Sequence, residues 1–187
     1  MKNIKKDLSQ KTLIILCLFI FSPTVGFSEV RKEYYKSGAL KKEVTFKNGI
    51  PEGPSKTYYE SGALQSEDTY KNGNLEGPYK EYYENGELQW EKTFKNGKRE
   101  GLSRLYYSSG ELQLEASYKN GKPEGPYKTY YKSGALKKEF TFKNDKQDGP
   151  HKTYYENGKL KAVRIYKDGK FISKKAYDKQ GKLIIEE

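Results

Sequence analysis

The chain has 187 residues, a formal net charge of +11 at pH 7 and only 34% hydrophobic residues, while tyrosine and glycine each occur 18 times. So little aliphatic material excludes a thick globular core, and the regular spacing of tyrosines and β-branched residues excludes a disordered chain. A thin, extended fold is therefore expected. The positive charge leaves two interpretations open, which are attraction to an acidic partner and simple solubility of a solvated sheet.

The first 28 residues have the layout of a secretory signal peptide. Four lysines open the segment, an unbroken apolar run of nine residues extends from Leu13 to Phe21, and Gly26 and Ser28 supply small residues before Glu29. Nine apolar residues are too few for a helix that spans a bilayer, although an uncleaved N-terminal anchor remains an alternative. We therefore expect export to the periplasm, the cell surface or the medium.

From residue 30 onward the sequence repeats with a period of 24 residues. Tyrosine pairs mark the period, and they begin at Tyr34, Tyr58, Tyr82, Tyr106, Tyr130 and Tyr154. The array is expected to fill residues 29–187, with repeats near 30–53, 54–77, 78–101, 102–125, 126–149 and 150–173 and a degenerate cap at 174–187. Six copies in register predict one repeat array without a linker or a second domain.

Each unit predicts a β-hairpin. In the third copy a strand over Tyr79–Tyr83 precedes a turn with Asn85 and Gly86, and a strand over Glu87–Lys95 precedes a longer turn over residues 96–101. Asn-Gly and Ser-Gly supply the positive φ of tight turns. Alternation of side chains puts leucines and aromatic residues on one face and a glutamate column beside a basic column on the other. The expected fold is all-β, an elongated single-layer antiparallel array of six hairpins without helices.

The sequence offers no catalytic, cofactor or metal site. His151 is the only histidine and is expected to be a surface strand residue, because catalysis needs a positioned partner and zinc needs further ligands. Single acids precede the turn glycines and are expected to be turn residues rather than calcium ligands. They are Glu52, Glu76, Glu100, Glu124 and Asp148. We therefore expect neither an enzyme nor a cofactor.

Two features are candidates for partner binding. The first is an aromatic ladder of one tyrosine from each pair, whose rings could stack on sugars, cations or protein side chains, unless both columns merely cover the sheet. Its members are Tyr58, Tyr82, Tyr106, Tyr130 and Tyr154. The second is a central patch of Trp90, Leu114, Leu105 and Leu102, which departs from the repeat pattern. Tryptophan is frequent in binding hot spots, yet these residues could equally thicken the core.

The unit Gly-Pro-Tyr-Lys-Thr-Tyr-Tyr, followed by Ser-Gly-Ala-Leu and Phe-Lys-Asn-Gly, resembles the MORN repeat variant of bacterial proteins, the repeat that also occurs in YwqK-type antitoxins. The resemblance covers residues 30 to about 185. It implies a non-catalytic array of hairpins that is used for protein–protein or membrane contact.

The leading hypothesis is an exported MORN-type scaffold that binds a protein or a cell-surface partner. The first alternative is an antitoxin or immunity protein that neutralises a toxin by direct binding, although YwqK-type antitoxins act in the cytosol. The second is a module that binds anionic membranes, which would lose affinity as salt rises. Nucleic acid is not expected as a partner, because glutamate columns balance the lysines and export removes the usual substrate. The oligomeric state stays open.

Overall fold

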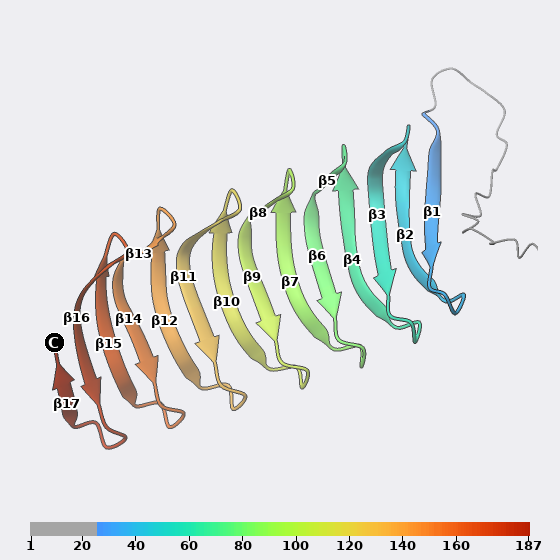
Figure 1. The fold of residues 1–187 in the computed structure, drawn as a ribbon. Coiled ribbons are helices and arrows are strands. Elements are labelled where there is room, and N and C mark those ends of the chain that lie inside the picture. The colour runs from blue at the N-terminus through green and yellow to red at the C-terminus, as the bar shows by residue number, and fades with distance from the viewer. Residues whose placement is uncertain (1–25) are drawn as a thin grey trace, which may run out of the picture.

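The computed structural model describes residues 26–187, which form one open antiparallel sheet of 17 strands (Figure 1). The prediction of an all-β antiparallel array is confirmed, and no helix occurs among the described residues. It follows that no helix in this part of the chain has the length and apolar character needed to cross a membrane. The predicted signal peptide lies outside the described residues except for its last three, and Ser28 already belongs to the first strand.

Each unit contributes two kinds of strand, which we call the a-strand and the b-strand. The a-strands are β1 (Ser28–Tyr34), β3 (Ile50–Tyr58), β6 (Gly77–Tyr82), β9 (Gly101–Tyr106), β11 (Lys122–Tyr130), β14 (Gly149–Tyr154) and β16 (Lys170–Tyr177). The b-strands are β2 (Leu40–Lys47), β4 (Leu64–Lys71), β7 (Leu88–Lys95), β10 (Leu112–Lys119), β12 (Leu136–Lys143), β15 (Leu160–Lys167) and β17 (Leu183–Glu186). Short strands precede three of the a-strands: β5 (Asn74–Leu75), β8 (Lys98–Arg99) and β13 (Lys146–Gln147).

The strands follow one another through the sheet in sequence order. Each a-strand pairs antiparallel with the b-strand after it, and each b-strand pairs with the a-strand of the next unit. Figure 1 shows the result as a long ribbon with β1 at one end, β17 at the other and turns along both long margins. A meander of this kind needs only short local connections.

The turn from a b-strand to the next a-strand is the tight one. In the third unit Lys95 pairs with Lys98, so Asn96 and Gly97 form a two-residue loop, and their φ angles are 50° and 73°. Positive φ at both positions defines a type I′ turn, whose twist matches that of the flanking strands. The expectation of a longer turn over residues 96–101 is therefore wrong, because the chain re-enters the sheet at Lys98.

The turn from an a-strand to its b-strand has three residues. In the third unit the Tyr83 amide donates to the Glu87 carbonyl at 2.8 Å, and the Gly86 amide donates to the Tyr83 carbonyl at 2.9 Å. Gly86 has a φ of 87°, while a Cβ built there would meet no atom within 4 Å. Backbone conformation alone, rather than lack of space, therefore favours glycine at this position.

Side chains alternate between two faces of different character. The uniform face repeats the same residue type in nearly every copy, whereas the varied face changes from copy to copy in its two central rows. One varied row runs Arg31, Val44, Ser55, Asp68, Tyr79, Lys92, Ser103, Ala116, Tyr127, Phe140, His151, Arg164 and Lys174. The other runs Glu33, Lys42, Thr57, Ser66, Glu81, Trp90, Leu105, Leu114, Thr129, Lys138, Thr153, Ala162, Ala176 and Ile185.

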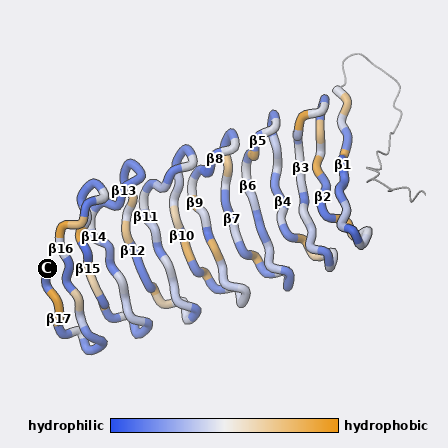
Figure 2. Tube along the Cα trace, in the orientation of Figure 1, coloured by the Kyte–Doolittle hydropathy of each residue, from blue (hydrophilic) through white to orange (hydrophobic). Residues whose placement is uncertain are grey.

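Full burial is confined to small side chains of the varied face. They are Val44, Ser55, Ser66, Ser103, Ala116, Ala162 and Ala176. Because residues 26–187 form no second layer over the sheet, only a side chain shorter than its cross-strand neighbours is hidden from water. Figure 2 shows hydrophilic turns along both margins and apolar residues on the strands, with a concentration at β16 and β17. Apolar residues of the predicted C-terminal cap are exposed, with Leu183 at 43% and Ile184 at 58%.

Candidate binding faces

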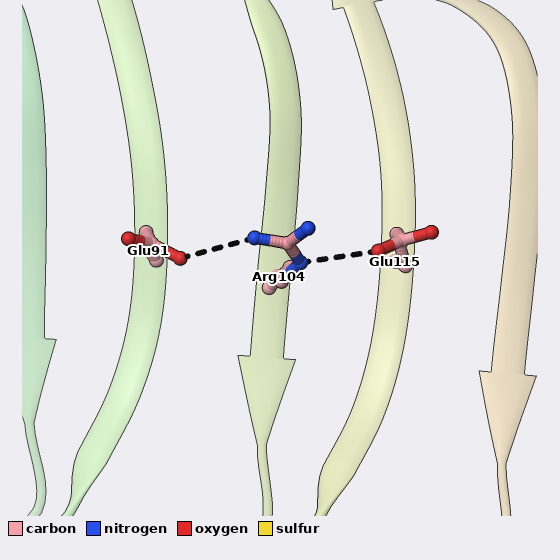
Figure 3. Close-up of polar contacts among 3 residues, drawn as sticks. All are labelled: Glu91, Arg104 and Glu115. Carbon is pink, nitrogen blue, oxygen red and sulfur yellow. Dashed lines mark hydrogen bonds and ion pairs between the residues drawn. The ribbon is translucent and has the colours of Figure 1, made fainter.

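The central row of the uniform face is a ladder of alternating charge. Glu43 stands opposite Lys56, and in the middle of the sheet Arg104 lies between two glutamates. Its Nε donates to Glu115 at 3.0 Å and its Nη1 to Glu91 at 3.5 Å (Figure 3). Exposed pairs of this kind contribute about 0.2–1 kcal/mol each. Because each cation stands beside acids, this row is not a basic patch.

The tyrosines of the predicted aromatic ladder are Tyr58, Tyr82, Tyr106, Tyr130 and Tyr154, and all five are half-buried. In three of them the hydroxyl donates to a glutamate of the preceding b-strand: Tyr58 to Glu43 at 2.8 Å, Tyr82 to Glu67 at 2.7 Å and Tyr154 to Glu139 at 2.6 Å. Burial and the adjacent carboxylate raise the pKa of Tyr82 and of Tyr154 to about 12. These hydroxyls thus belong to the hydrogen-bond framework of the sheet.

The second tyrosine of each pair ties its unit to the next. Its hydroxyl donates to the backbone carbonyl of the first tyrosine one unit further on, at 2.8–2.9 Å in all six cases. The donors are Tyr35, Tyr59, Tyr83, Tyr107, Tyr131 and Tyr155, and the acceptors are Tyr58, Tyr82, Tyr106, Tyr130, Tyr154 and Tyr177. Both tyrosine columns therefore have a structural role.

The acids before the turn glycines also connect neighbouring units. Each accepts the backbone N–H of the tight turn in the following unit: Glu52 from Asn72 at 2.6 Å, Glu76 from Asn96 at 2.7 Å, Glu100 from Asn120 at 2.8 Å, Glu124 from Asn144 at 3.0 Å and Asp148 from Asp168 at 3.1 Å. Within residues 26–187, no group of three histidine, cysteine or acidic residues is placed to hold a metal ion.

Three members of the predicted central patch are neighbours on the varied face. Leu105 pairs in register with Trp90 on one side and with Leu114 on the other. All three are half-buried, and no second layer lies over them in the part of the chain that the structure describes. The Lys92 ammonium lies 4.4 Å from the centroid of the Trp90 ring, and burial lowers the pKa of this lysine. The patch is thus an apolar surface with a cation at its border.

Leu102 does not join these three residues. It pairs with Ser117 on the uniform face, where it is 37% exposed. Three positions separate it from Leu105, and an odd separation within a strand puts two side chains on opposite faces. The central patch therefore consists of Trp90, Leu105 and Leu114 alone.

A second group of rings crosses the C-terminal half of the varied face. We call Tyr127, Phe140, His151, Tyr166 and Phe171 the aromatic strip, since they lie on five successive strands from β11 to β16. Neighbouring ring centroids are 4.6 Å apart for Tyr127–Phe140 and Phe140–His151, and 6.0 Å for His151–Tyr166 and Tyr166–Phe171. These are ordinary distances for stacked and edge-to-face rings.

His151 is a member of this strip rather than a freely exposed surface residue. Neither of its ring nitrogens has a hydrogen-bond partner within the described residues. Burial lowers the pKa of His151, and the charges of Lys138 and Arg164 lower it further. The ring is therefore neutral near pH 7 and contributes as an apolar, stackable surface.

Sequence reasoning did not find the aromatic strip. Comparison at a period of 24 residues aligns equivalent positions of different units, whereas the strip joins non-equivalent positions of adjacent strands. Tyr127 and Phe140 are brought together by the register of β11 and β12. The signal was present in the alternation of the strands, because a meander places residues about a dozen positions apart side by side.

Comparisons with known proteins show the family but no specific function. No curated protein matches the chain. A crystal structure of accessory secretory proteins 1, 2 and 3 from Streptococcus pneumoniae aligns with 66% of this chain at 13% identity and a TM-score of 0.33. The alignment takes in only 22% of that protein chain. The MORN repeat variant matches residues 30–48, 51–72, 75–96, 99–120, 123–144 and 147–168, and the chain belongs to this family.

Proposed function

We propose that this chain is an exported, non-enzymatic scaffold that binds a protein or a cell-surface partner through its varied face. MORN repeats commonly bind proteins or membranes, which sets the class of function. The choice of face rests on one observation, namely that the strand positions at which the units differ most lie on the varied face, chiefly in its two central rows.

The two faces have different roles: the uniform face stabilises the repeat, and the varied face is available for a partner. The uniform face keeps its glutamate, lysine, threonine and tyrosine columns, which make the cross-strand contacts on which every unit depends. In the varied rows the position of Ala116 is a valine, aspartate, lysine, phenylalanine or arginine in the other copies. A row that tolerates such changes is not required for the repeat itself, so it is free to fit a partner.

The varied face also carries the chemistry of an interface. Trp90, Leu105 and Leu114 form a compact apolar patch, and the aromatic strip extends the apolar surface towards β16. Aromatic side chains dominate the binding energy of many interfaces, because they bury a large area at a small entropic cost. Long repeat arrays present such surfaces as extended platforms.

A protein partner fits this surface better than a bare anionic membrane does. A membrane surface would require a concentration of cations, whereas the lysines of the uniform face stand beside glutamates such as Glu67 and Glu139. A toxin would be one such protein partner, and the identity of the captured protein would distinguish an antitoxin from another scaffold.

Export rests on the pattern of residues 1–28. We expect the chain expressed from its full sequence in a bacterial host to be recovered outside the cytosol with Glu29 as its first residue. Mass spectrometry of the intact protein from each cell fraction tests this expectation. A cytosolic chain that keeps its first residues would contradict export and leave the binding face unaffected.

The binding function is tested by affinity capture from envelope and culture-supernatant fractions. Trp90→Ala removes the largest ring of the central patch, and we expect it to weaken capture of the partner at least tenfold. Leu102→Ala is the matched control, because it removes a comparably central apolar side chain from the opposite face. Phe140→Ala asks whether the aromatic strip belongs to the same contact.

The outcomes are distinct. One stoichiometric protein that is captured by the parent and by Leu102→Ala but lost in Trp90→Ala supports the proposal. Equal capture by Trp90→Ala, Phe140→Ala and Leu102→Ala would place binding elsewhere than on the central patch and the aromatic strip of the varied face. Retention on anionic vesicles without any protein partner, weakened by salt, would replace the protein scaffold with a membrane-binding module.

A further inference from the structure

The two ends of the sheet are complementary to each other. β1 is an a-strand and β17 is a b-strand, and within residues 26–187 each pairs on one side only. Inside the sheet every b-strand is followed by an a-strand, as β4 is by β6 and β7 is by β9. The free edge of β17 is therefore open to an a-strand, and the free edge of β1 is open to a b-strand.

The interior junctions define the register that such a pair would have. A glutamate of the b-strand stands opposite a lysine of the next a-strand, as Glu43 does opposite Lys56 and Glu67 opposite Lys80. Glu186 occupies the glutamate position of β17, because it pairs with Lys175 of the preceding a-strand. Lys32 occupies the lysine position of β1, because it pairs with Glu43. The same register sets Glu187 opposite Arg31.

Side chains at both edges are exposed where their interior counterparts have partners. Tyr58 donates to Glu43 of the preceding b-strand at 2.8 Å. Tyr34 holds the same position in β1, has no such strand before it among the described residues, and is 53% exposed. On β17 Glu186 pairs with Lys175 of β16 at 2.7 Å, and its side chain is still 57% exposed, while Ile184 is 58% exposed. The acceptor that Tyr34 lacks is thus the group that β17 presents.

We propose that β17 of one copy of this chain pairs with β1 of a second copy, so that the sheet continues from molecule to molecule. Glu186 then pairs with Lys32 and Glu187 with Arg31, while the Tyr34 hydroxyl donates to Glu186. The backbone groups along the two edges complete the ladder that each edge strand lacks.

Lys32 would acquire the same surroundings as the one arginine of the charge ladder. Within its own chain Lys32 lies 3.4 Å from Glu43, and the junction adds a second acid on its other side. Arg104 has this arrangement inside the sheet, between Glu91 and Glu115 (Figure 3). The junction therefore repeats an arrangement that the fold already contains.

Charge and strand type favour the head-to-tail contact over the symmetric ones. Two β17 edges in register would bring Glu186 and Glu187 of both copies together, and like charges across an interface disfavour this pairing. The edge of β1 is mixed in charge, because Glu29 and Glu33 stand beside Arg31 and Lys32, but the interior register that puts a glutamate opposite Lys32 requires a b-strand such as β17 rather than a second β1. A head-to-tail contact is not self-complementary, so it leads to open-ended chains of molecules rather than to a closed dimer.

The contact is short, since β17 has four residues. We therefore expect association to depend on concentration and to weaken as salt screens the ion pairs. Sedimentation velocity of the chain expressed from its full sequence, up to about 500 μM, measures this. The weight-average mass should rise continuously, without levelling off at twice the monomer mass.

Two charge variants make the test specific. Glu186→Lys with Glu187→Lys reverses the β17 edge, and Arg31→Glu with Lys32→Glu reverses the β1 edge. Each variant alone presents like charges at every junction, and it should stay monomeric at concentrations where the parent associates. In a mixture of the two variants, the reversed β17 of one meets the reversed β1 of the other, and the unchanged β17 meets the unchanged β1. Both junctions are then complementary in charge, so association should return. Glu84→Lys with Glu87→Lys, in an exposed turn, is the control for changed net charge.

Circular dichroism of each variant establishes that the sheet is retained. Association of the parent, its loss in both edge variants, its return in the mixture and its persistence in the control together support the pairing of β17 with β1. A parent chain that stays monomeric throughout the range overturns the proposal. So does association that survives either edge reversal, or a mixture of the folded variants that stays monomeric.

Discussion

At each tight turn, the first loop residue is not glycine and yet holds a left-handed backbone conformation. In the third unit this residue is Asn96, with a φ of 50°, and the equivalent positions are Asn48, Asn72, Asn120, Asn144 and Asp168. Asparagine and aspartate tolerate this region because their short polar side chains interact with the local backbone. The fold therefore depends on the residue type at six separate points.

Asn96→Ala should destabilise the third unit by about 1 kcal/mol, because alanine keeps the Cβ strain of this conformation and lacks the polar side chain that lets asparagine tolerate it. Asn96→Gly avoids the strain and should cost less, since glycine adopts positive φ freely. Urea unfolding followed by circular dichroism compares the midpoints of the two variants with that of the parent. Equal midpoints for alanine and glycine would show that the turn does not require positive φ at residue 96.

His151 should make the stability of the sheet depend on pH. Burial holds its pKa below the ordinary 6.5, so the folded chain keeps the ring neutral where the unfolded chain binds a proton. Stability therefore falls as the pH decreases through about 6.5, until the pKa of the folded state is reached. His151→Tyr, which installs the residue found at Tyr79 and Tyr127, removes this contribution.

The measurement is the thermal midpoint of parent and variant between pH 8 and pH 5, and we expect the parent to lose more stability than His151→Tyr across this range. The variant should stack on Phe140 as Tyr127 does, at a centroid distance of 4.6 Å. Parallel pH profiles for the two proteins would show that His151 is as accessible to protons in the folded chain as in the unfolded one.

At the scale of the element, the second tyrosine of each pair couples two units. Tyr107 donates to the carbonyl of Tyr130 at 2.9 Å, across the junction of the fourth and fifth units. Tyr107→Phe removes the donor and should lower the free energy of unfolding by about 1 kcal/mol. Tyr118→Phe is the control. It also removes a tyrosine hydroxyl, but from a ring that packs against Arg99, 5.0 Å away, on one face of the sheet.

Hydrogen exchange distinguishes the effects of the two variants on the protection of individual strands. Tyr107→Phe should reduce protection on both sides of the junction, in β9 and in β11, because the hydroxyl joins the two. Tyr107 lies in the turn directly after β9, so a loss confined to β9 would mean that the tyrosine stabilises its own hairpin and does not couple units.

The elements themselves could be predicted from the sequence because the period of 24 residues and the alternation within strands are both local signals. They give the hairpins, the two faces and the pairing of Glu43 with Lys56. The bond from Glu52 to the turn amide of Asn72 could not be predicted, because it depends on how one unit stacks on the next. Within the candidate site, the alternation of side chains along a strand already places Leu102 and Leu105 on opposite faces. The aromatic strip could not be predicted in this way, because it depends on the register between adjacent strands.

At the scale of the whole molecule, the sheet behaves as a one-dimensional array. Substantial contacts join only strands that are neighbours in the ribbon, and none of these contacts bridges distant units within the described residues. Stability in such an array is the sum of terms for each unit and for each junction. The loss of stability caused by one substitution should therefore be largest in its own unit and decrease with distance along the sheet.

A proline in the centre of the sheet tests this architecture. Glu115 lies in β10 and pairs with Lys128 on one side and with Arg104 on the other, so Glu115→Pro removes a ladder hydrogen bond and leaves its acceptor unpaired, at a cost of about 1–3 kcal/mol. Glu186→Pro in β17 is the matched edge variant. Because Glu187 exchanges both backbone bonds with Lys174, the neighbouring N–H of Glu186 points away from β16 and the ladder is spared.

Hydrogen exchange at low protein concentration separates a linear array from a single cooperative unit. We expect Glu115→Pro to abolish protection in β9, β10 and β11 while β3 and β15 keep most of theirs, since their own junctions are intact. Glu186→Pro should leave every strand but β17 as protected as in the parent. A uniform loss of protection from β1 to β16 in Glu115→Pro would mean that the junctions couple the units so strongly that the sheet unfolds only as a whole.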